Sequence, residues 1–522
     1  MDYEAVIGIE VHAQLLTESK MFCRCNADYA AAEPNTHACP ICLGMPGVLP
    51  VINQKAVEYT VMTALALNCQ IPEFSKFDRK NYFYPDLPKG YQISQYDLPL
   101  SRDGWLEIEV GGETKRIGIE RVHQEEDTAK LVHLGGHSLV DFNRAGVPLM
   151  EIVSRPDIRT PEEARQYLTK LRTILRYLGV NSGNMEEGAM RCEANISLRP
   201  RGRSELGAKV EVKNLNSFHS VKLALKYEIA RQAKALEASG RIEQVTMGWD
   251  EARGVTVVQR SKEQAHDYRY FPEPDLPPLV LSREWVEGIR ARLPELPDAR
   301  RDRFVEQYGL SRYDAEVLTA ERAVADYFES CASACPDAKT VANWITGELF
   351  RLLKATDEGI EAVKLTPDAL AELLTLVRKG SISIHIAKDV FAEMFETGRP
   401  ASQIVREKGL IQISDVEELS RIVEQVIAEN PGPAAEYLAG KKPVLRFLVG
   451  QVMKATRGKA NPHLANKLFE EKMNELRSRV QEGAKAEGRP TKFTDLKGIW
   501  KGANFSYEEI KAAEYQVPED LL

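Results

Sequence analysis

Apolar and polar residues alternate along four separate stretches of the chain, and each polar side combines carboxylates with basic or amide groups. In the first stretch, residues 7–14, Ile7 and Ile9 alternate with residues that include Glu10, His12 and Gln14. Successive side chains of a β-strand point to opposite faces, so Glu10 and His12 are predicted to share one face of a strand.

Three later stretches repeat the alternation, over residues 117–125, 191–199 and 209–213. In the first of them we expect Ile117 and Ile119 to lead along one strand face to Arg121, His123 and Glu125. The polar sides of the other two consist of Arg191, Glu193, Asn195, Ser197, Arg199, Lys209, Glu211 and Lys213. An ordinary solvated face of an antiparallel sheet is the alternative. Four such faces together favour a surface that carries chemistry.

Beyond about residue 280 the apolar residues recur at helical spacing, after a proline-rich linker between Pro272 and Pro297. One helix is predicted to begin at Thr366, which is suited to an N-cap. Its predicted buried stripe consists of Leu370, Leu373, Leu374 and Val377. Another helix is predicted over 415–427, and the segment 430–433, Asn-Pro-Gly-Pro, is expected to end it.

The fold class predicted from these patterns is α+β. An N-terminal, mainly antiparallel β cradle with helices is followed by an all-α helical domain and a helical tail domain. The predicted boundaries are 1–289 for the cradle, 290–407 for the helical domain, 408–474 for the tail and 475–522 for a C-terminal extension. A short helix is predicted within the extension from Ser506, with Glu509 as a capping residue. No role follows for the extension.

Composition limits the classes of function. The 522 residues have 43% hydrophobic residues and a formal net charge of −8, which is typical of a globular protein. No apolar run approaches the roughly 18 residues that cross a membrane, and the first residues lack a signal pattern. We therefore expect a cytoplasmic location and no membrane partner. The negative charge excludes a wholly basic nucleic-acid-binding protein, so contact with nucleic acid requires a local patch.

The tail contains such a patch of positive charge. Its residues are Lys441, Lys442, Arg446, Lys454, Arg457 and Lys459, with Lys467 beyond. The interspersed Leu445, Phe447, Leu448 and Val452 predict a helix that packs on one side and offers positive charge to phosphates on the other. A charge run is often only a solvated surface, which is the alternative here.

Four of the eight cysteines are closely spaced, as Cys23-x-Cys25 and Cys39-x-x-Cys42. Thiolates at this spacing can close a tetrahedral zinc site in a loop with little core of its own. Four thiolates leave no open position for water, so the predicted zinc would be structural. Redox-active or simply reduced cysteines are the alternatives. The other four are predicted to be buried small hydrophobes, namely Cys69, Cys192, Cys331 and Cys335.

The segment 79–95 has neither a helical nor a strand period and is predicted to be a loop. Its basic residues, Arg79, Lys80 and Lys89, are candidates to receive phosphate oxygens. Its aromatic residues, Tyr82, Tyr84 and Tyr91, offer stacking faces and hydroxyls. Aromatics that merely pack over the sheet are the alternative. A similar composition returns at 266–275, which includes Arg269.

Long and rare strings in a fixed order give the chain a close resemblance to a known family. They are Ile7-Gly8-Ile9-Glu10-Val11-His12, Cys42-Leu43-Gly44-Met45-Pro46-Gly47, the Arg79 to Gln95 segment, Glu125-Glu126-Asp127, Asp141 to Pro148, Glu211 to Ser217 and Asp267 to Pro272. Over residues 1 to about 474 the chain resembles the B subunit of the bacterial glutamyl/aspartyl-tRNA amidotransferase, the GatB family. Typical members stop near Met473, and Glu193 stands where the family is expected to have Asp.

The resemblance implies an ATP-dependent ligase that forms a carbon–nitrogen bond. ATP phosphorylates the side-chain carboxylate of Glu-tRNA(Gln) or Asp-tRNA(Asn), and ammonia then displaces phosphate. It implies Mg²⁺ held by Glu10, Glu125 and Glu151. His12 is expected beside the ion, as a further ligand, or as the proton acceptor from ammonia.

The remaining implied roles concern phosphate and substrate. Lys80 and Lys89, with Arg191 and Lys213, are candidates to stabilise phosphate charge, and Asn195 to orient substrate. The predicted substrate- and ATP-binding residues are Tyr82, Tyr84, Arg191, Asn195, Lys213 and Arg269. The sequence has no Gly-x-x-x-x-Gly-Lys-Ser/Thr phosphate loop, so ATP would use the sheet face.

The sequence also lacks an amidase signature. The resemblance therefore implies a partner amidase, the A subunit, which supplies ammonia from glutamine, and a small C subunit that completes a heterotrimer. Misacylated tRNA is the implied substrate. The alternative is a noncatalytic tRNA-binding scaffold, for which carboxylates facing phosphate would be unfavourable without a cation. Signature pairs of a tRNA synthetase are missing from the sequence, which makes a stand-alone synthetase a weaker interpretation.

Overall fold

The computed structural model describes residues 2–238, 240–261, 268–356, 358–410, 416–456 and 459–486. Arg457 of the predicted patch and the helix predicted from Ser506 lie outside these residues. The chain divides into two compact units, one formed by Met1–Arg303 with Thr319–Arg322 and the other by Phe304–Leu318 with Ala323–Leu522.

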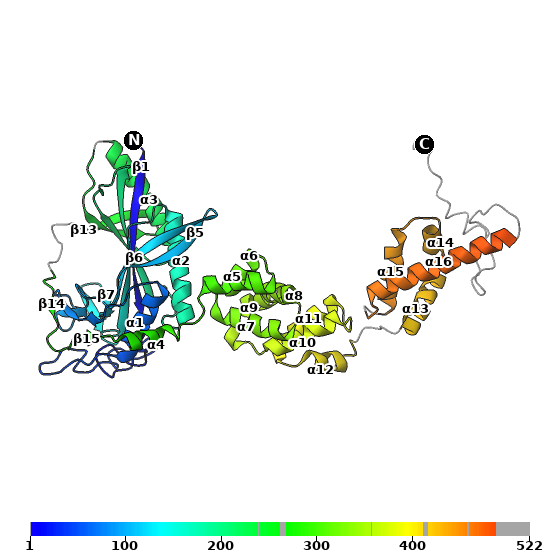
Figure 1. Cartoon of the computed structure of the whole chain (residues 1–522), viewed down its shortest axis with the longest axis horizontal. Helices are drawn as coiled ribbons and strands as arrows, with labels where there is room; N and C mark the ends of the chain where they lie inside the picture. The colour runs from blue at the N-terminus through cyan, green and yellow to red at the C-terminus, as the bar shows by residue number, and fades with distance from the viewer. Residues whose placement is uncertain are drawn as a thin grey trace. The chain divides into compact units, whose positions relative to one another are not determined.

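An eight-stranded sheet organises the first unit, in the order β13-β12-β11-β10-β1-β9-β6-β5 (Figure 1). Its neighbouring strands are antiparallel except for β11 and β12, which are parallel. The strands of this sheet are β1 Tyr3–Gln14, β5 Gly104–Val110, β6 Glu113–Glu126, β9 Pro148–Ser154, β10 Met190–Pro200, β11 Val210–Leu215, β12 Val245–Asp250 and β13 Val255–Ser261.

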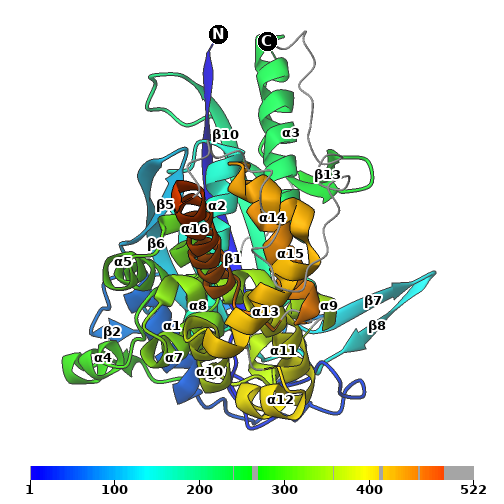
Figure 2. The same cartoon turned by 90° about the vertical axis from the view of Figure 1, so that its right-hand side faces the viewer.

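Smaller sheets flank it. The strands β2 Phe74–Ser75 and β15 Leu279–Val280 pair with each other, β3 Asp78–Asn81 lies between β4 Tyr91–Ser94 and β14 Phe271–Pro272, and β7 Lys130–Leu134 pairs with β8 His137–Asp141. The last pair extends from the sheet as a hairpin (Figure 2). The prediction that the whole segment 79–95 is a loop is therefore wrong at both ends, where β3 and β4 form. Its ends pair through backbone hydrogen bonds, and β14 joins them from far along the chain.

Three helices cover one face of the large sheet, namely α1 Gln54–Ala66, α2 Pro161–Leu178 and α3 Phe218–Glu237. Helix α2 begins with an N-cap, because Thr160 accepts a hydrogen bond from the Glu163 amide and Pro161 follows it. Ile7, Ile9 and other strand residues pack with these helices in one core. The face with Glu10 and His12 points away from that core.

A β-bulge interrupts the alternation of β6, so the prediction of one continuous face from Ile117 to Glu125 is wrong. Ile117 and Ile119 are fully buried in the core, whereas Arg121, His123 and Glu125 belong to the opposite face. The register against β9 shifts between Ile119 and Arg121, because two residues of β6 oppose one step of β9. Beyond such an extra residue, each side chain points to the opposite face from the one that strict alternation predicts. Ile119 and Arg121 are therefore two residues apart but lie on different faces.

The second unit is helical in its described part. Its helices and the helices that precede it are α4 Arg283–Arg290, α5 Pro297–Tyr308, α6 Arg312–Thr319, α7 Arg322–Ala334, α8 Ala338–Trp344, a π-helix Ile345–Leu349, α9 Phe350–Thr356, a 3₁₀-helix Ile360–Ala362, α10 Pro367–Arg378, α11 Ile384–Thr397, α12 Ala401–Glu407, α13 Val416–Glu429, α14 Pro431–Leu438, α15 Val444–Ala455 and α16 Pro462–Ala486. One core spans residues 304–405 and another spans 419–473. The α+β fold class predicted from the sequence is confirmed.

The helical predictions hold in part. Thr366 caps α10 by accepting a hydrogen bond from the Ala369 amide, as predicted. The segment 430–433 ends α13 but also starts α14, since Pro431 is well tolerated at a first helical position. Phe447 of α15 is 48% exposed, so its predicted packing role is wrong; Leu448 and Val452 form the buried side.

No helix in the described part of the chain is long and apolar enough to cross a lipid bilayer.

Candidate functional site

The polar face of the large sheet collects titratable side chains from five neighbouring strands, β11, β10, β1, β9 and β6. His12 of β1 lies opposite Glu151 of β9 and opposite Arg191 of β10. Glu10 lies opposite Glu193 in the same ladder. Because directly opposite residues of antiparallel strands point to the same face, the strand register alone brings these side chains together.

A first group consists of His12, Glu125 and Glu151. The imidazole Nε2 of His12 lies 3.3 Å from a carboxylate oxygen of Glu125 and 3.6 Å from one of Glu151. His123 approaches the same Glu151 carboxylate to 3.2 Å. One donor atom of each member of this group lies within 4.8 Å of the others, so the group could hold a metal ion.

The charges in this group stabilise one another. Burial opposes the charged imidazole, but the carboxylates of Glu151 and Glu125 raise the pKa of His12 to about 9. Burial also opposes the charged carboxylates, yet His12 holds the pKa of Glu125 below its usual value. His123 and His12 do the same for the pKa of Glu151. Two carboxylates are therefore ionised here at neutral pH.

A second group consists of Glu10, Glu193 and Glu211, again within 4.8 Å of one another. Lys213 lies 2.8 Å from Glu193 and 3.5 Å from Glu211. Burial, followed by the charges of Glu151 and Glu193, raises the pKa of Glu10. The predicted set of Glu10, Glu125, Glu151 and His12 is thus divided between two neighbouring groups. Sequence reasoning gave no metal role to Glu193 or Glu211, although both are on predicted polar faces.

Asn195 connects strand β10 to the second group. Its amide nitrogen donates a hydrogen bond of 2.8 Å to Glu10. Its side-chain oxygen is buried and has no hydrogen-bond partner among the described residues. An unpartnered acceptor beside three carboxylates is a further oxygen ligand that a hard cation would satisfy.

Lys80 faces the first group from strand β3. Burial opposes its charge, but Glu125 and other neighbours raise the pKa of its ammonium. The ammonium lies 5.0 Å from the centre of the Tyr268 ring. No carboxylate of the described residues lies within 4.0 Å of it, so Lys80 has no close ion pair. Its positive charge is available to a phosphate group.

Other predicted residues near β3 have different surroundings. Lys89 forms an ion pair of 2.7 Å with Glu126, and both line a cavity of about 190 Å³ beside the cysteine loop. Tyr82 packs edge-on against Tyr268. The side chains of Tyr84 and Arg269 are exposed at the surface. The guanidinium of Arg79 donates two hydrogen bonds to Glu273, so its charge is already paired with a carboxylate.

Asp127 is a site residue that sequence reasoning did not select. Its buried carboxylate accepts hydrogen bonds of 2.8 Å from Arg191 and 2.7 Å from Gln14. Burial opposes ionisation, but Arg191 and Arg144 hold the pKa of Asp127 below its usual value. Asp127 thus orients the Arg191 guanidinium on the sheet face. Its place in the Glu-Glu-Asp string was the available signal.

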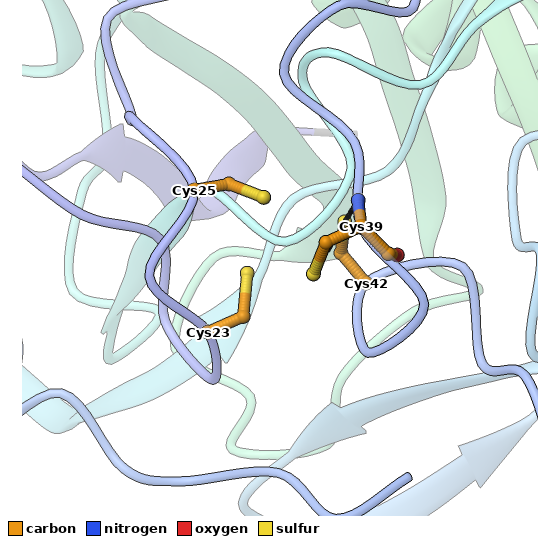
Figure 3. A group of neighbouring side chains, drawn as sticks. All are labelled: Cys23, Cys25, Cys39 and Cys42. Carbon is orange, nitrogen blue, oxygen red and sulfur yellow. Dashed lines mark hydrogen bonds between the residues drawn. The ribbon is translucent and has the colours of Figure 1, made fainter.

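The four clustered cysteines converge in space. Their side chains point into one common volume (Figure 3), and their sulfur atoms lie within 4.8 Å of one another. The sulfurs of Cys39 and Cys42 are 3.8 Å apart. The Cys23 thiol, the Cys39 amide and the nearby Lys20 ammonium lower the pKa of Cys42 to about 4, against the effect of burial. The cluster is suited to a metal ion. The other four cysteines are buried, as predicted.

Comparison with known proteins adds to this geometry. A family model described as "GatB/GatE catalytic domain" matches residues 5–287, and one described as "GatB domain" matches residues 326–473. The chain belongs to the GatB family.

Individual GatB relatives match nearly the whole chain. A protein of Carboxydothermus hydrogenoformans, named as the B subunit of aspartyl/glutamyl-tRNA(Asn/Gln) amidotransferase, is 58% identical over 480 residues, which cover 91% of this chain and 100% of the relative. A protein of the same name from Caldanaerobacter subterraneus is 60% identical over 475 residues, with the same two coverages. One from Thermodesulfovibrio yellowstonii is 56% identical over 470 residues, covering 90% of this chain and 99% of the relative.

The candidate residues fall into different GatB family matches. Both carboxylate groups and the four cysteines lie within the catalytic-domain match, and the basic tail residues lie within the other. Among the latter, Lys441, Lys442, Arg446 and Lys454 are exposed, whereas Lys459 is half-buried. Lys441 lies 3.6 Å from Glu436. An exposed positive surface is therefore present on α15 and the turn before it.

Proposed function

We propose that this chain is the subunit of a tRNA-dependent amidotransferase that activates a side-chain carboxylate with ATP and then forms the amide. The substrates are Glu-tRNA(Gln), Asp-tRNA(Asn) or both. The observation that carries the proposal is the sheet face that holds both groups of carboxylates, with Lys80 near the first group, in a chain whose relatives bear the amidotransferase name. A surface that only docked RNA would gain nothing from buried carboxylates.

The residues present fit Mg²⁺. Glu10, Glu193 and Glu211 offer oxygen ligands, and the unpartnered oxygen of Asn195 lies beside them. Glu125 and Glu151 offer a second set together with His12, a less typical magnesium ligand. When bound, Mg²⁺ would neutralise phosphate charge and so reduce its repulsion of the attacking carboxylate.

The chain's own residues would handle the remaining charge and the protons. A carboxylate oxygen of the aminoacyl group attacks the γ-phosphorus of ATP, and ADP leaves; Lys80 stabilises the phosphoryl charge. Ammonia then attacks the acyl carbon, and inorganic phosphate leaves with the electrons of the broken carbon–oxygen bond. His12 is the residue assigned to accept the proton released from nitrogen, and it does so only as the neutral imidazole, because Glu151 and Glu125 raise its pKa to about 9.

We assign zinc to the four cysteines. A tetrahedron with zinc–sulfur distances of about 2.3 Å has sulfur–sulfur edges of about 3.8 Å, and Cys39 and Cys42 already show this separation. All four ligand positions are filled by sulfur, so the role is structural: the ion would hold the loop between Cys23 and Cys42.

The resemblance to the GatB family implies the partners. Ammonia comes from a partner amidase, the A subunit, while a small C subunit completes the heterotrimer, consistent with relatives that are named as the B subunit. The exposed Lys441, Lys442, Arg446 and Lys454 bind the tRNA backbone, and this contact gives the tail, 408–474, its role. Residues 1–289 form the catalytic cradle and 290–407 a helical connector.

The decisive test is conversion of Glu-tRNA(Gln) to Gln-tRNA(Gln) by the purified complex, with ammonium chloride replacing glutamine. Ammonium bypasses the partner amidase, so the assay isolates the chemistry assigned to this chain. The proposal predicts product only when ATP and Mg²⁺ are both present. Binding of Glu-tRNA(Gln) without conversion would instead support the scaffold alternative.

A further inference from the structure

Lys20 has an unusual environment for a lysine. It lies between the end of strand β1 and Cys23, and it is 1% exposed. Its ammonium donates hydrogen bonds to the carbonyl oxygens of His37 at 2.6 Å and Phe142 at 3.3 Å. The sulfur of Cys42 lies 3.9 Å from the same nitrogen. The ammonium is therefore held at a fixed position against the cysteine cluster.

The contacts of Lys20 lack an ordinary counter-charge. Among the described residues, no carboxylate oxygen lies within 4.0 Å of the ammonium, and both carbonyl partners are neutral. A buried ammonium is strongly unfavourable unless an anion compensates it. Within the described part of the chain, the only neighbouring group at that distance that can carry negative charge is the Cys42 sulfur.

We propose that Lys20 is a positioning residue and counter-ion for a metal centre of four thiolates. This inference rests on the zinc centre proposed above. Four thiolates and one divalent cation together carry a net charge of two negative units. Burying this charge is unfavourable without a nearby cation. Lys20 offsets part of that charge, and its two carbonyl contacts hold the loop around the sulfurs. Residues beyond the direct ligands commonly tune metal affinity in this way.

Hydrogen bonds connect this centre to the catalytic face. The amide of Met21 donates to the Gly146 carbonyl at 2.7 Å, and the Gly146 amide donates to the Asp127 carbonyl at 2.9 Å. The buried Asn143 side chain accepts from the His37 amide at 2.7 Å. The segment that contacts Lys20 through Phe142 is thus the segment that supports Asp127. Loss of the metal would loosen the support of Asp127, and through it Arg191.

The test compares Lys20→Met with a matched control, Lys226→Met, in the full complex. Methionine keeps the length and apolar stem of lysine but removes its charge. Lys226 is exposed on helix α3 and has no role in the proposal. Zinc content and zinc affinity are measured by competition with a colorimetric chelator. We expect Lys20→Met to weaken zinc binding by at least about tenfold, while Lys226→Met keeps the affinity of the unaltered protein.

A second measurement uses the unaltered protein, so it does not depend on the folding of a variant. Amine acetylation is mapped by mass spectrometry before and after zinc removal. Lys20 should resist acetylation with zinc bound and react once zinc is gone, while Lys226 reacts in both states.

The outcomes separate the two proposals. Unaltered protein that contains no zinc would overturn the zinc centre and this inference with it. Zinc that is bound equally tightly by Lys20→Met, or a Lys20 whose reactivity does not change on zinc removal, would overturn the role of Lys20 alone.

Discussion

His12 and Glu151 occupy opposite positions in the β1–β9 ladder, and the His12 Nε2 lies 3.6 Å from the Glu151 carboxylate. Backbone hydrogen bonds of a central strand pair fix this relationship, so it does not depend on a flexible loop. A site on a rigid sheet keeps its ligands at constant separations.

Metal binding by the group of His12, Glu125 and Glu151 should depend on pH. The raised pKa of His12, about 9, means that the free site is protonated below that value. A cation must displace this proton. Apparent Mn²⁺ affinity should therefore rise about tenfold per pH unit from pH 7 toward pH 9 and then level off. Mn²⁺ titration followed by electron paramagnetic resonance measures this.

The titration is best made in a Glu211→Gln background, which weakens the second group. A His12→Gln variant is the control, because it has no proton to displace and should show a flat profile. An affinity that stays constant between pH 7 and 9 with His12 present would argue against metal ligation by the imidazole.

Removing the Asp127 carboxylate should destabilise the sheet face. Asp127→Ala leaves Arg191 and Arg144 without their shared partner. Loss of one member of a buried pair costs about 3 to 5 kcal/mol; the lower end applies here because the Arg191 side chain is 37% exposed. We expect urea unfolding to show a loss of about 3 kcal/mol in the free energy of unfolding. Asp250→Ala, which breaks a surface pair with Arg253, should cost under about 1 kcal/mol. Equal losses would contradict the assigned role.

The sequence was sufficient where the relevant partners are close along the chain. The two-residue period around Glu10 and His12 identified the polar face of β1, and the spacing of Cys23, Cys25, Cys39 and Cys42 identified a group that does converge. Local signals also identified the start of α10 at Thr366.

Features that depend on distant partners could not be predicted in this way. The bulge at Ile119 to Arg121 exists because β6 pairs with β9, and the small sheet of β3 and β4 gains its third strand from residues 271–272, far along the chain. The division of the carboxylates into two groups follows from the register of five strands. The role of Lys20 could not be predicted from nearby residues, because it depends on contacts of its ammonium with Cys42 and Phe142.

Strand β5 begins at a glycine that has no room for a side chain. A Cβ on Gly104 would lie 2.3 Å from the Cys69 sulfur and 2.5 Å from the Leu67 carbonyl oxygen. Gly104→Ala should therefore lower the free energy of unfolding by about 2 to 3 kcal/mol, as expected for overpacking. Gly135→Ala, where nothing lies within 4 Å of the added carbon, is the control and should stay within about 0.5 kcal/mol in the same urea titration.

Neutralising the exposed tail charges should weaken tRNA binding in a salt-dependent way. We expect a triple alanine variant of Lys441, Lys442 and Arg446 to bind tRNA more weakly, with a slope of log affinity against log salt that is smaller by about 2 to 3. Filter binding at several salt concentrations measures this. The control replaces three exposed lysines elsewhere, Lys339, Lys354 and Lys379. If both triple variants bound like the unaltered protein, the tail charges would be only a solvated surface.

The most direct test of the central claim is the phosphorylation step by itself. The complex is mixed with Glu-tRNA(Gln), ATP and Mg²⁺ without ammonia or glutamine, and ADP formation is followed in a single turnover. The comparison is between Glu125→Gln, in the first carboxylate group, and Glu113→Gln, exposed at the far end of the same strand β6. The account predicts normal ADP formation for Glu113→Gln and at least about a 100-fold slower rate for Glu125→Gln. A Glu125→Gln rate within twofold of the unaltered protein would contradict it.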